Sequence, residues 1–271
     1  MKHEQKMYKE LKFTDDFMFG KVLTNSPEVC RRLLELLLGI RIKKVLVPEK
    51  QKVVEILSDG KGIRLDVYVD DEEGTVYDIE MQTSLKKDLP KRSRYYQGMI
   101  DMNLIERGAK YKELKRSFVI FICLEDPFGR ALPVYRFENI CIQDRSLELK
   151  DEAVKVFINA DGDLAEANED MATFLRYLKG SGCDSELVRM IDGEVERARL
   201  HKEWEVEYMT LYLRDQENRE EGREEGREES ETRLILNMHN RGYALEEIAK
   251  IAEKGIEEVE AIIEKAGSAL A

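Results

Sequence analysis

The sequence predicts an α/β protein in which helices flank a mixed β-sheet, with a helical extension at the C-terminus. Two acidic segments, 62–70 and 75–82, alternate apolar and polar residues with the period of two that is typical of half-buried strands. An unbroken apolar run at 117–124 is typical of a strand buried on both faces. A basic segment with helical spacing, 90–107, lies between them. Together these elements indicate a sandwich of helices around a sheet.

Composition limits the class of protein. The 271 residues are 42% hydrophobic and 37% charged, which fits one substantial core with a small extra domain and excludes a chain disordered throughout. No segment approaches the roughly 18 consecutive apolar residues of a membrane span, and the N-terminus lacks the apolar core of a signal peptide. We therefore expect a cytoplasmic protein with no membrane partner.

Cysteine and histidine usage argues against a zinc site. The cysteines, at positions 30, 123, 141 and 183, show no C-x-x-C spacing and are expected to be reduced and partly buried. The 3 histidines are widely separated, which gives little support to zinc or to a histidine-based triad. Any metal in this chain is expected to be held by oxygen.

The N-terminal elements are predicted from their end signals. A first helix is expected over 13–23, with Thr14 or Asp15 as its N-cap. A second helix is expected over Pro27–Leu38, because proline opens it and Gly39 follows it. Candidate strands at 43–47 and 53–57 then lead into the acidic pair.

The acidic pair is expected to be an antiparallel hairpin, because residues 71–74 are turn-like. A register in which paired residue numbers sum to 146 sets Asp66 directly across from Glu80. Side chains directly opposite approach within about 5 Å, and two carboxylates that close repel unless a cation or a shared proton intervenes. Oxygen ligands at that separation suit Mg²⁺ or Mn²⁺.

The net charge of −12 argues at first against nucleic acid, since phosphate binding needs positive charge. The charge is unevenly distributed, however. Residues 86–116 hold ten Lys or Arg against four Asp or Glu, whereas residues 217–231 hold eight Glu against three Arg. The basic segment begins four residues after Gln82 and offers a surface for DNA, although an ordinary solvated face remains the alternative.

Beyond residue 124 the elements become shorter. Two strands are expected at 134–141 and 154–158, at an edge or in an extension, and a short helix at 171–178. We place the end of the main domain, 1–183, at the glycines that follow that helix.

Residues 184–231 are expected to form a linker built on a long charged helix, 186–231, which contains a tandem Gly-Arg-Glu-Glu repeat. Arg–Glu pairs stabilise a solvated helix by about 0.2–0.5 kcal/mol each and each glycine costs about 0.8–1.0 kcal/mol, so the two effects nearly cancel. A frayed, solvent-exposed helix is expected, with a spacer that pairs with a partner as the alternative.

Residues 232–271 have the outline of a helix-turn-helix. The last helix is acidic, so a packing or homo-oligomerisation unit is favoured over DNA reading.

Five short motifs then carry a family resemblance. They are Thr14-Asp15-Asp16-Phe17-Met18-Phe19, Arg64-Leu65-Asp66-Val67, Ile79-Glu80-Met81-Gln82, Arg94-Tyr95-Tyr96 and Asp126-Pro127-Phe128-Gly129. In this order they resemble the PD-(D/E)XK nuclease superfamily, with its restriction-endonuclease-like core, and within it the Rpn-type recombination-promoting nucleases, or PD-(D/E)XK nuclease family transposases. The resemblance spans about residues 10–231. It implies a metal-dependent endonuclease that hydrolyses DNA phosphodiester bonds in recombination, mobile elements or defence.

The resemblance also implies roles for individual residues. Asp66 and Glu80 would hold the divalent ion, with the Met81 carbonyl completing its shell; Mg²⁺ is expected, with Mn²⁺ or Ca²⁺ as alternatives. Gln82 takes the place of the superfamily's lysine, and it supplies an amide that can orient the attacking water but no positive charge. Asp16 is the best match for the acidic residue of the first helix, with Asp15 and Glu28 behind it.

Residues of the basic segment are expected to contact the phosphate backbone of DNA. These are Lys91, Arg92, Arg94, Tyr95 and Tyr96. The simpler alternatives are that the tyrosines belong to the core and that Asp66 and Glu80 are solvent-facing and paired with Arg64 or a lysine. On those alternatives the chain is a catalytically decayed nuclease fold that binds DNA, or an oligomeric scaffold.

Overall fold

The computed structural model describes residues 6–46, 48–54, 63–105, 108–182 and 184–268, without the side chains of 50–54, 63–64 and 267–268. The chain divides into two compact units, Met1–Glu205 and Val206–Ala271. Each is described by itself below.

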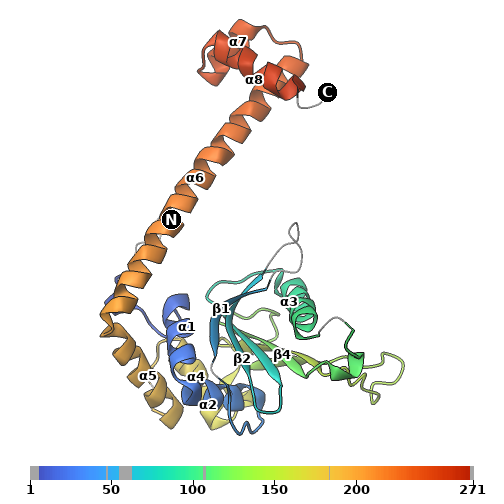
Figure 1. Cartoon of the computed structure of the whole chain (residues 1–271), viewed down its shortest axis with the longest axis vertical. Coiled ribbons are helices and arrows are strands. Elements are labelled where there is room, and N and C mark those ends of the chain that lie inside the picture. Colours follow the sequence, from blue (N-terminus) through green and yellow to red (C-terminus); the bar gives the residue numbers. More distant parts are fainter. Residues whose placement is uncertain (1–5, 47, 55–62, 106–107, 183, 269–271) are drawn as a thin grey trace. The chain divides into compact units, whose positions relative to one another are not determined.

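The first unit is built on a mixed six-stranded sheet with the order β1-β2-β3-β4-β6-β5 (Figure 1). The strands are β1 (Glu49–Val54), β2 (Ile63–Asp70), β3 (Val76–Gln82), β4 (Ser117–Cys123), β5 (Val134–Phe137) and β6 (Ala153–Asn159). β3, β4 and β6 are parallel to one another, whereas β1–β2, β2–β3 and β5–β6 are antiparallel. The predicted α/β fold with a mixed sheet is confirmed.

Helices cover both faces of this sheet. They are α1 (Asp16–Asn25), α2 (Pro27–Leu38), α3 (Leu89–Leu104), α4 (Glu169–Leu178) and α5 (Glu186–Arg199). α1, α2, α4 and α5 pack against one another on one side, and α3 lies alone on the other side (Figure 1). The sheet is therefore the middle layer of three.

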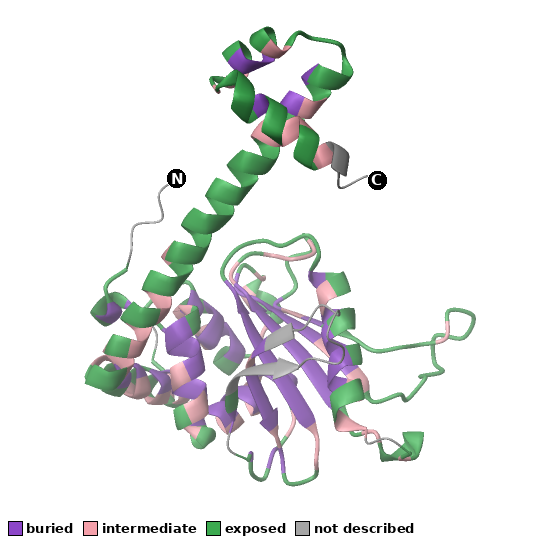
Figure 2. Cartoon of the chain, turned by 45° about the horizontal axis from the view of Figure 1, so that its top comes forward, coloured by how far each residue is buried: buried purple, intermediate pink, exposed green. Residues whose placement is uncertain are grey.

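The expectation that the acidic strands are half-buried is wrong for β3, since each of its residues is buried (Figure 2). The physical reason is α3, whose Tyr96, Met99 and Ile100 pack on Tyr68 and Phe121 of the sheet. The face that the alternation predicted to be polar is consequently closed off from water. The carboxylates on it lie inside the protein.

The predicted N-terminus of α1 and both predicted ends of α2 are confirmed, whereas α1 continues to Asn25, two residues beyond the stretch in which it was expected. Asp15 is the N-cap of α1, and α2 runs over Pro27–Leu38, where Gly39 takes the left-handed conformation (φ 64°) that ends a helix. The strand expected at 43–47 is wrong, since its only recorded pairing is an isolated bridge between Val45 and Asp71. The next strand, β1, begins earlier than expected, and residues 55–57 of the expected strand lie outside the described residues.

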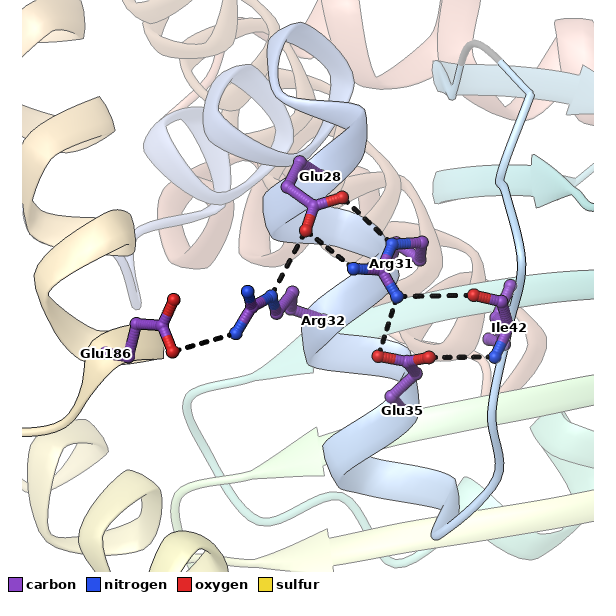
Figure 3. A network of polar contacts seen from close by, with 6 residues as sticks. All are labelled: Glu28, Arg31, Arg32, Glu35, Ile42 and Glu186. Carbon is purple, nitrogen blue, oxygen red and sulfur yellow. Dashed lines mark hydrogen bonds and ion pairs between the residues drawn. The ribbon is translucent and has the colours of Figure 1, made fainter.

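α2 is tied to its neighbours by a polar network (Figure 3). The network contains Glu28, Arg31, Arg32, Glu35, Ile42 and Glu186. Arg31 donates to Glu28 (2.6 Å) and to the Ile42 carbonyl (3.2 Å), while Arg32 pairs with Glu186 of α5 (3.0 Å). The hydrogen bond from Arg31 is the main reason why the pKa of Glu28 is lowered to about 2. Glu28 is therefore occupied by these contacts, which leaves Asp16 and Asp15 as the acidic candidates on the first helix.

Two expectations for the later elements need correction. β5 is at the sheet edge as expected, but β6 lies inside the sheet between β4 and β5. The continuous helix expected over 186–231 is wrong, because the chain breaks it at Leu200 and His201 into α5 and α6 (Lys202–Asn240). At the break the rings of His201 and Trp204 stack with their centroids 4.3 Å apart.

α5 belongs to the first unit, although the sequence placed the end of that domain at residue 183. The Tyr8 hydroxyl donates to the Ala198 carbonyl, and the Arg199 guanidinium donates to the Leu11 carbonyl (2.7 Å). Contacts of α5 with α1 and α2 complete the attachment.

The second unit contains the rest of α6 together with α7 (Leu245–Ala252) and α8 (Ile256–Ser268). A small core holds the ends of these helices together: Ile235, Met238, Ile248, Ala249 and Val259. The Gly-Arg-Glu-Glu repeat is helical and each of the residues 217–230 is exposed, as the sequence predicts. No helix in the described part of the chain combines the length and the apolar character needed to cross a membrane.

Replacement of Gly162 by alanine is expected to destabilise the first unit by about 1–3 kcal/mol, as overpacking does. A Cβ at this position, just after β6, would lie 2.5 Å from the Pro133 Cα. Denaturant unfolding measures the effect, with Gly98→Ala in α3 as the matched control, because a Cβ there meets nothing within 4 Å. Equal stability of the two variants would contradict the expectation.

Candidate active site

The hairpin of β2 and β3 has the predicted register. The recorded pairs are Val67–Ile79, Tyr68–Asp78, Val69–Tyr77 and Asp70–Val76, and in each of them the residue numbers sum to 146. Continuing this register by one residue sets Asp66 opposite Glu80. The predicted register is confirmed for the four recorded pairs.

The two carboxylates reach across the hairpin toward each other's strand. The Asp66 N–H donates to Glu80 Oε1 (3.0 Å), and the Met81 N–H donates to Asp66 Oδ2 (3.2 Å). Glu80 is fully buried and Asp66 is half-buried. These bonds fix both side chains at the same end of the hairpin. The Asp66 carboxylate is partly exposed to solvent there, whereas that of Glu80 is not.

Arg92, on the second turn of α3, supplies a cation to this pair. Its guanidinium lies 2.5 Å from Glu80 Oε2, donates to Gln82 Oε1 (3.2 Å), and donates through Nε to the Tyr96 hydroxyl (2.8 Å). The aromatic ring of Tyr96, whose centroid is 5.0 Å away, packs on the same group. The side chain of Arg92 is 30% exposed, so solvent and solutes can still reach it.

Carboxyl groups nevertheless outnumber basic groups here, and this disfavours their ionised forms. Burial first, and then the neighbouring charge of Asp66, raise the pKa of Glu80 to about 8 in spite of Arg92. Asp78, two residues earlier on the same face of β3, is fully buried, and neither of its oxygens has a hydrogen-bond partner in the described part of the chain. Burial, and then the charges of Glu80 and Asp66, raise the pKa of Asp78 well above its usual range. Three carboxylates thus share one arginine.

The two acidic candidates of the first helix differ. Asp16 is the exposed first residue of α1, and its charge contributes to the raised pKa of Glu80, so it acts on the site electrostatically. Asp15 is instead bonded to Lys6 Nζ (2.5 Å) and to the Lys12 N–H (2.7 Å). The structure therefore favours Asp16, which the sequence also ranked first.

The residues expected to bind DNA do not form one group. Lys91, Arg94 and Tyr95 are exposed on α3, whereas Tyr96 is buried against Phe121 (ring centroids 6.2 Å apart). Tyr96 thus belongs to the core and supports Arg92, which matches the simpler alternative for that residue. DNA contact by the exposed three stays a prediction.

The Asp126-Pro127-Phe128-Gly129 motif has a structural role in the loop between β4 and β5. Asp126 accepts hydrogen bonds from the Phe128 N–H (3.0 Å), the Ala131 N–H (2.8 Å) and the Tyr135 hydroxyl (2.8 Å). Burial would raise the pKa of Asp126, but these bonds outweigh it and hold the pKa below its usual value. The motif fixes the loop that leads into β5.

Two features of the site escaped the sequence reasoning. The first is the ion pair between Arg92 and Glu80, and the second is the burial of Asp78. Both had a weak signal: Arg92 and Tyr96 have the i, i+4 spacing of neighbours on a helix, and Asp78 has the same strand parity as Glu80.

The residues of the site fit a divalent cation. Asp66 and Glu80 could supply oxygen ligands, and the raised pKa values of Glu80 and Asp78 show that these carboxyl groups have too little positive charge around them to ionise readily. Within the residues that the structure describes, no group of three or more His, Cys, Asp or Glu side chains is arranged to hold a metal. A hard cation such as Mg²⁺ commonly uses one or two carboxylates and fills the rest of its shell with water and substrate phosphate.

Comparison with known proteins agrees with this geometry. Residues 13–159 match the family described as PD-(D/E)XK nuclease family transposase, and these residues contain α1, the acidic hairpin, α3 and all six strands. The chain belongs to the PD-(D/E)XK nuclease family transposases. No curated protein and no solved structure matches the chain.

The family match ends at β6 and does not include α4, α5 or the second unit, so it is shorter than the resemblance over 10–231 that the motifs indicated. Membership supports a nuclease-like function. PD-(D/E)XK nucleases generally use divalent metal ions, which agrees with the oxygen ligands of this transposase-family site.

Proposed function

We propose that this member of the PD-(D/E)XK transposase family is a metal-dependent DNA endonuclease that hydrolyses phosphodiester bonds. The proposal includes Mg²⁺ as the physiological cation and a role in the cytoplasm in recombination, mobile elements or defence. The observation that carries it is the convergence of Asp66 and Glu80 across the β2–β3 hairpin.

Each side chain has a chemical task in this proposal. Asp66 and Glu80 hold the cation, which supplies charge neutralisation and water activation when it is bound. Gln82 orients the attacking water through its amide. Arg92 stabilises negative charge on the phosphate, because its guanidinium already lies beside Glu80 and Gln82. Lys91 and Arg94 contact the DNA backbone without reading sequence.

A plasmid assay tests the proposal. Supercoiled plasmid is incubated with the full chain in Mg²⁺, Mn²⁺, Ca²⁺ or EDTA, and we expect nicked or linear product with Mg²⁺ or Mn²⁺ and none with EDTA. Intact plasmid under every metal condition would contradict endonuclease activity.

Arg92→Gln is expected to lower the cleavage rate about a hundredfold, the usual effect of removing one preorganised donor from a transition state. Arg94→Gln is the matched control, because Arg94 is an exposed arginine on the same helix two residues further on. We expect this control to weaken DNA binding and to leave the cleavage rate at saturating DNA close to that of the wild type. Equal losses in both variants would assign Arg92 to DNA binding alone.

A second candidate function is DNA binding without cleavage, by a nuclease fold whose chemistry has decayed. Gln82 favours it, because the superfamily's lysine is replaced and the Gln82 amide oxygen is already bonded to Arg92. On this proposal the wild-type protein shifts DNA in gels and cuts it in no metal. The plasmid assay and a gel shift on the same preparation separate the two functions.

A further inference from the structure

The hairpin of β5 and β6 extends beyond the sheet as an arm, residues 138–152 (Figure 1, yellow-green). Large hydrophobic side chains are exposed along it, just before β5 and at the end of β5. They are Leu132, Phe137, Ile140, Ile142, Leu147 and Leu149, with Ile142 at 82%. An exposed apolar cluster of this size beside a sheet edge is typical of an interaction surface.

The outer edge of this hairpin has its main-chain groups directed away from β6. The recorded inward bonds involve odd-numbered residues: the Asn159 N–H donates to the Pro133 carbonyl, the Leu149 N–H to the Asn139 carbonyl, and the Cys141 N–H to the Leu147 carbonyl (2.9 Å each). Main-chain groups alternate between the two edges along a strand, so those of residues 134, 136, 138 and 140 face outward. In the described sheet, β5 has β6 on one side and no strand on the other.

This outer edge is complementary to itself. An antiparallel pairing of two copies in which residue numbers sum to 274 sets Arg136 opposite the partner's Glu138, and Phe137 opposite itself on the two-fold axis. The same register sets Val134 opposite Ile140. Leu132 lies opposite Ile142 beyond this ladder, because its N–H already donates to the Tyr135 hydroxyl and its carbonyl accepts from the Asn159 amide. Outward-facing even residues then meet outward-facing even residues, as a hydrogen-bonded antiparallel ladder requires.

Charge is also complementary. Within one chain, the Arg136 Nε lies 2.5 Å from Glu138 Oε1, so pairing two copies joins two such pairs into a network of alternating sign. The segment 132–149 contains two arginines and three acidic residues, which disfavours nucleic acid as its partner. We propose that the outer edge of β5 and the arm, residues 132–142, pairs with the same segment of a second copy of this chain.

The pairing is isologous and therefore closes at a dimer. It is independent of the proposed nuclease function, since none of the residues of the Asp66–Glu80 site takes part. The surface that pairs differs from the one expected from the sequence, where the C-terminal helices were the candidates for self-association.

A charge swap tests the proposal by analytical ultracentrifugation of the full chain. The wild type is expected to dimerise, and Arg136→Glu, which places glutamates opposite each other twice, is expected to raise the dissociation constant of the dimer at least about tenfold. The double variant Arg136→Glu/Glu138→Arg restores opposite charges in the same register and is expected to return the constant to within about threefold of the wild type. Arg145→Glu, on the same arm outside the pairing, is the control and is expected to leave it unchanged.

Three outcomes would overturn the proposal. They are a wild type that stays monomeric up to its solubility limit, a dimer that Arg136→Glu leaves intact, and a double variant that remains as weak as the single one. Thermal unfolding of each variant at low concentration shows that the monomer is folded, so a loss of dimer is not a loss of fold. Plasmid cleavage is read separately, and its failure has no bearing on these results.

Discussion

Glu80→Gln is expected to lower the rate of DNA cleavage by about a hundred- to a thousandfold, the range found when a charged group is removed from a preorganised active site. Glutamine keeps the size of the side chain and an oxygen that can accept from the Asp66 N–H. It removes the charge with which Glu80 would hold a divalent cation. The measurement is the single-turnover cleavage rate on plasmid with saturating Mg²⁺.

The same substitution has a second, independent readout in the pH dependence of stability. The folded-state pKa of Glu80 is raised from 4.5 to about 8, so the folded protein binds a proton more tightly than the unfolded chain does. The contribution of Glu80 to stability is therefore fully present below about pH 4.5 and is lost as pH rises through about 8. Glu80→Gln should flatten this decline in the free energy of unfolding.

Controls separate charge from position. Asp66→Asn is expected to reduce cleavage as Glu80→Gln does, because the two residues act on the same cation. Glu72→Gln, an exposed carboxylate in the turn of the same hairpin, is expected to leave cleavage unchanged. Full activity in both Glu80→Gln and Asp66→Asn would exclude them from the reaction.

Asp78→Asn is expected to stabilise the fold by about 1–3 kcal/mol at pH 8, because a buried carboxylate without a partner costs more free energy than a buried amide does. Asp78 is fully buried without a hydrogen-bond partner in the described residues, and Glu80 and Asp66 add repulsion. Since the pKa of Asp78 is raised, as that of Glu80 is, its contribution to the free energy of unfolding has the same pH dependence. The wild type loses stability as pH rises. The gain from asparagine should accordingly grow from pH 5 to pH 8.

Thermal unfolding at the two pH values measures this gain. For a domain of roughly 200 residues, each kcal/mol moves the melting temperature by about 2–4 °C. Glu125→Gln removes an exposed carboxylate just after β4 and should change the melting temperature little at either pH. An Asp78→Asn protein that melts lower than the wild type at pH 8 would show that Asp78 has a stabilising partner.

The register of the acidic hairpin could be predicted because it depends on local chemistry. Alternation fixes which residues share a face, and the short turn at 71–74 leaves few registers for the two strands. Asp66 and Glu80 were therefore found from the sequence. Their neighbours on the sheet, β4 and β6, were predicted as strands, but the position of β6 inside the sheet depends on long-range pairing that no local pattern encodes.

Arg92 and Asp78 show what local patterns leave out. The i, i+4 spacing places Arg92 and Tyr96 on one side of α3, but the rotation of that helix against the sheet is set by the packing of Met99 and Ile100 on Phe121. The same packing closes the face that holds Asp78. A polar residue at a strand position predicts exposure only where nothing covers the strand. Here α3 covers it.

The break at Leu200 and His201 between α5 and α6 had no signal of its own, since neither proline nor glycine occurs there. The break follows from tertiary contacts instead. Tyr8 and Leu11 bind the last residues of α5, Ala198 and Arg199, and the stacking of His201 on Trp204 begins the next helix.

The shortness of the β2–β3 turn also sets the order of events when the chain folds. A hairpin closed by a few residues forms in microseconds, whereas β4 can join β3 only after the 34 residues between Gln82 and Ser117, which include α3, have been brought back across the sheet. We expect Asp66, Asp78 and Glu80 to come together as soon as this hairpin forms, so that their mutual repulsion falls on an early step of folding. Protons or cations in the surrounding solution would lessen it.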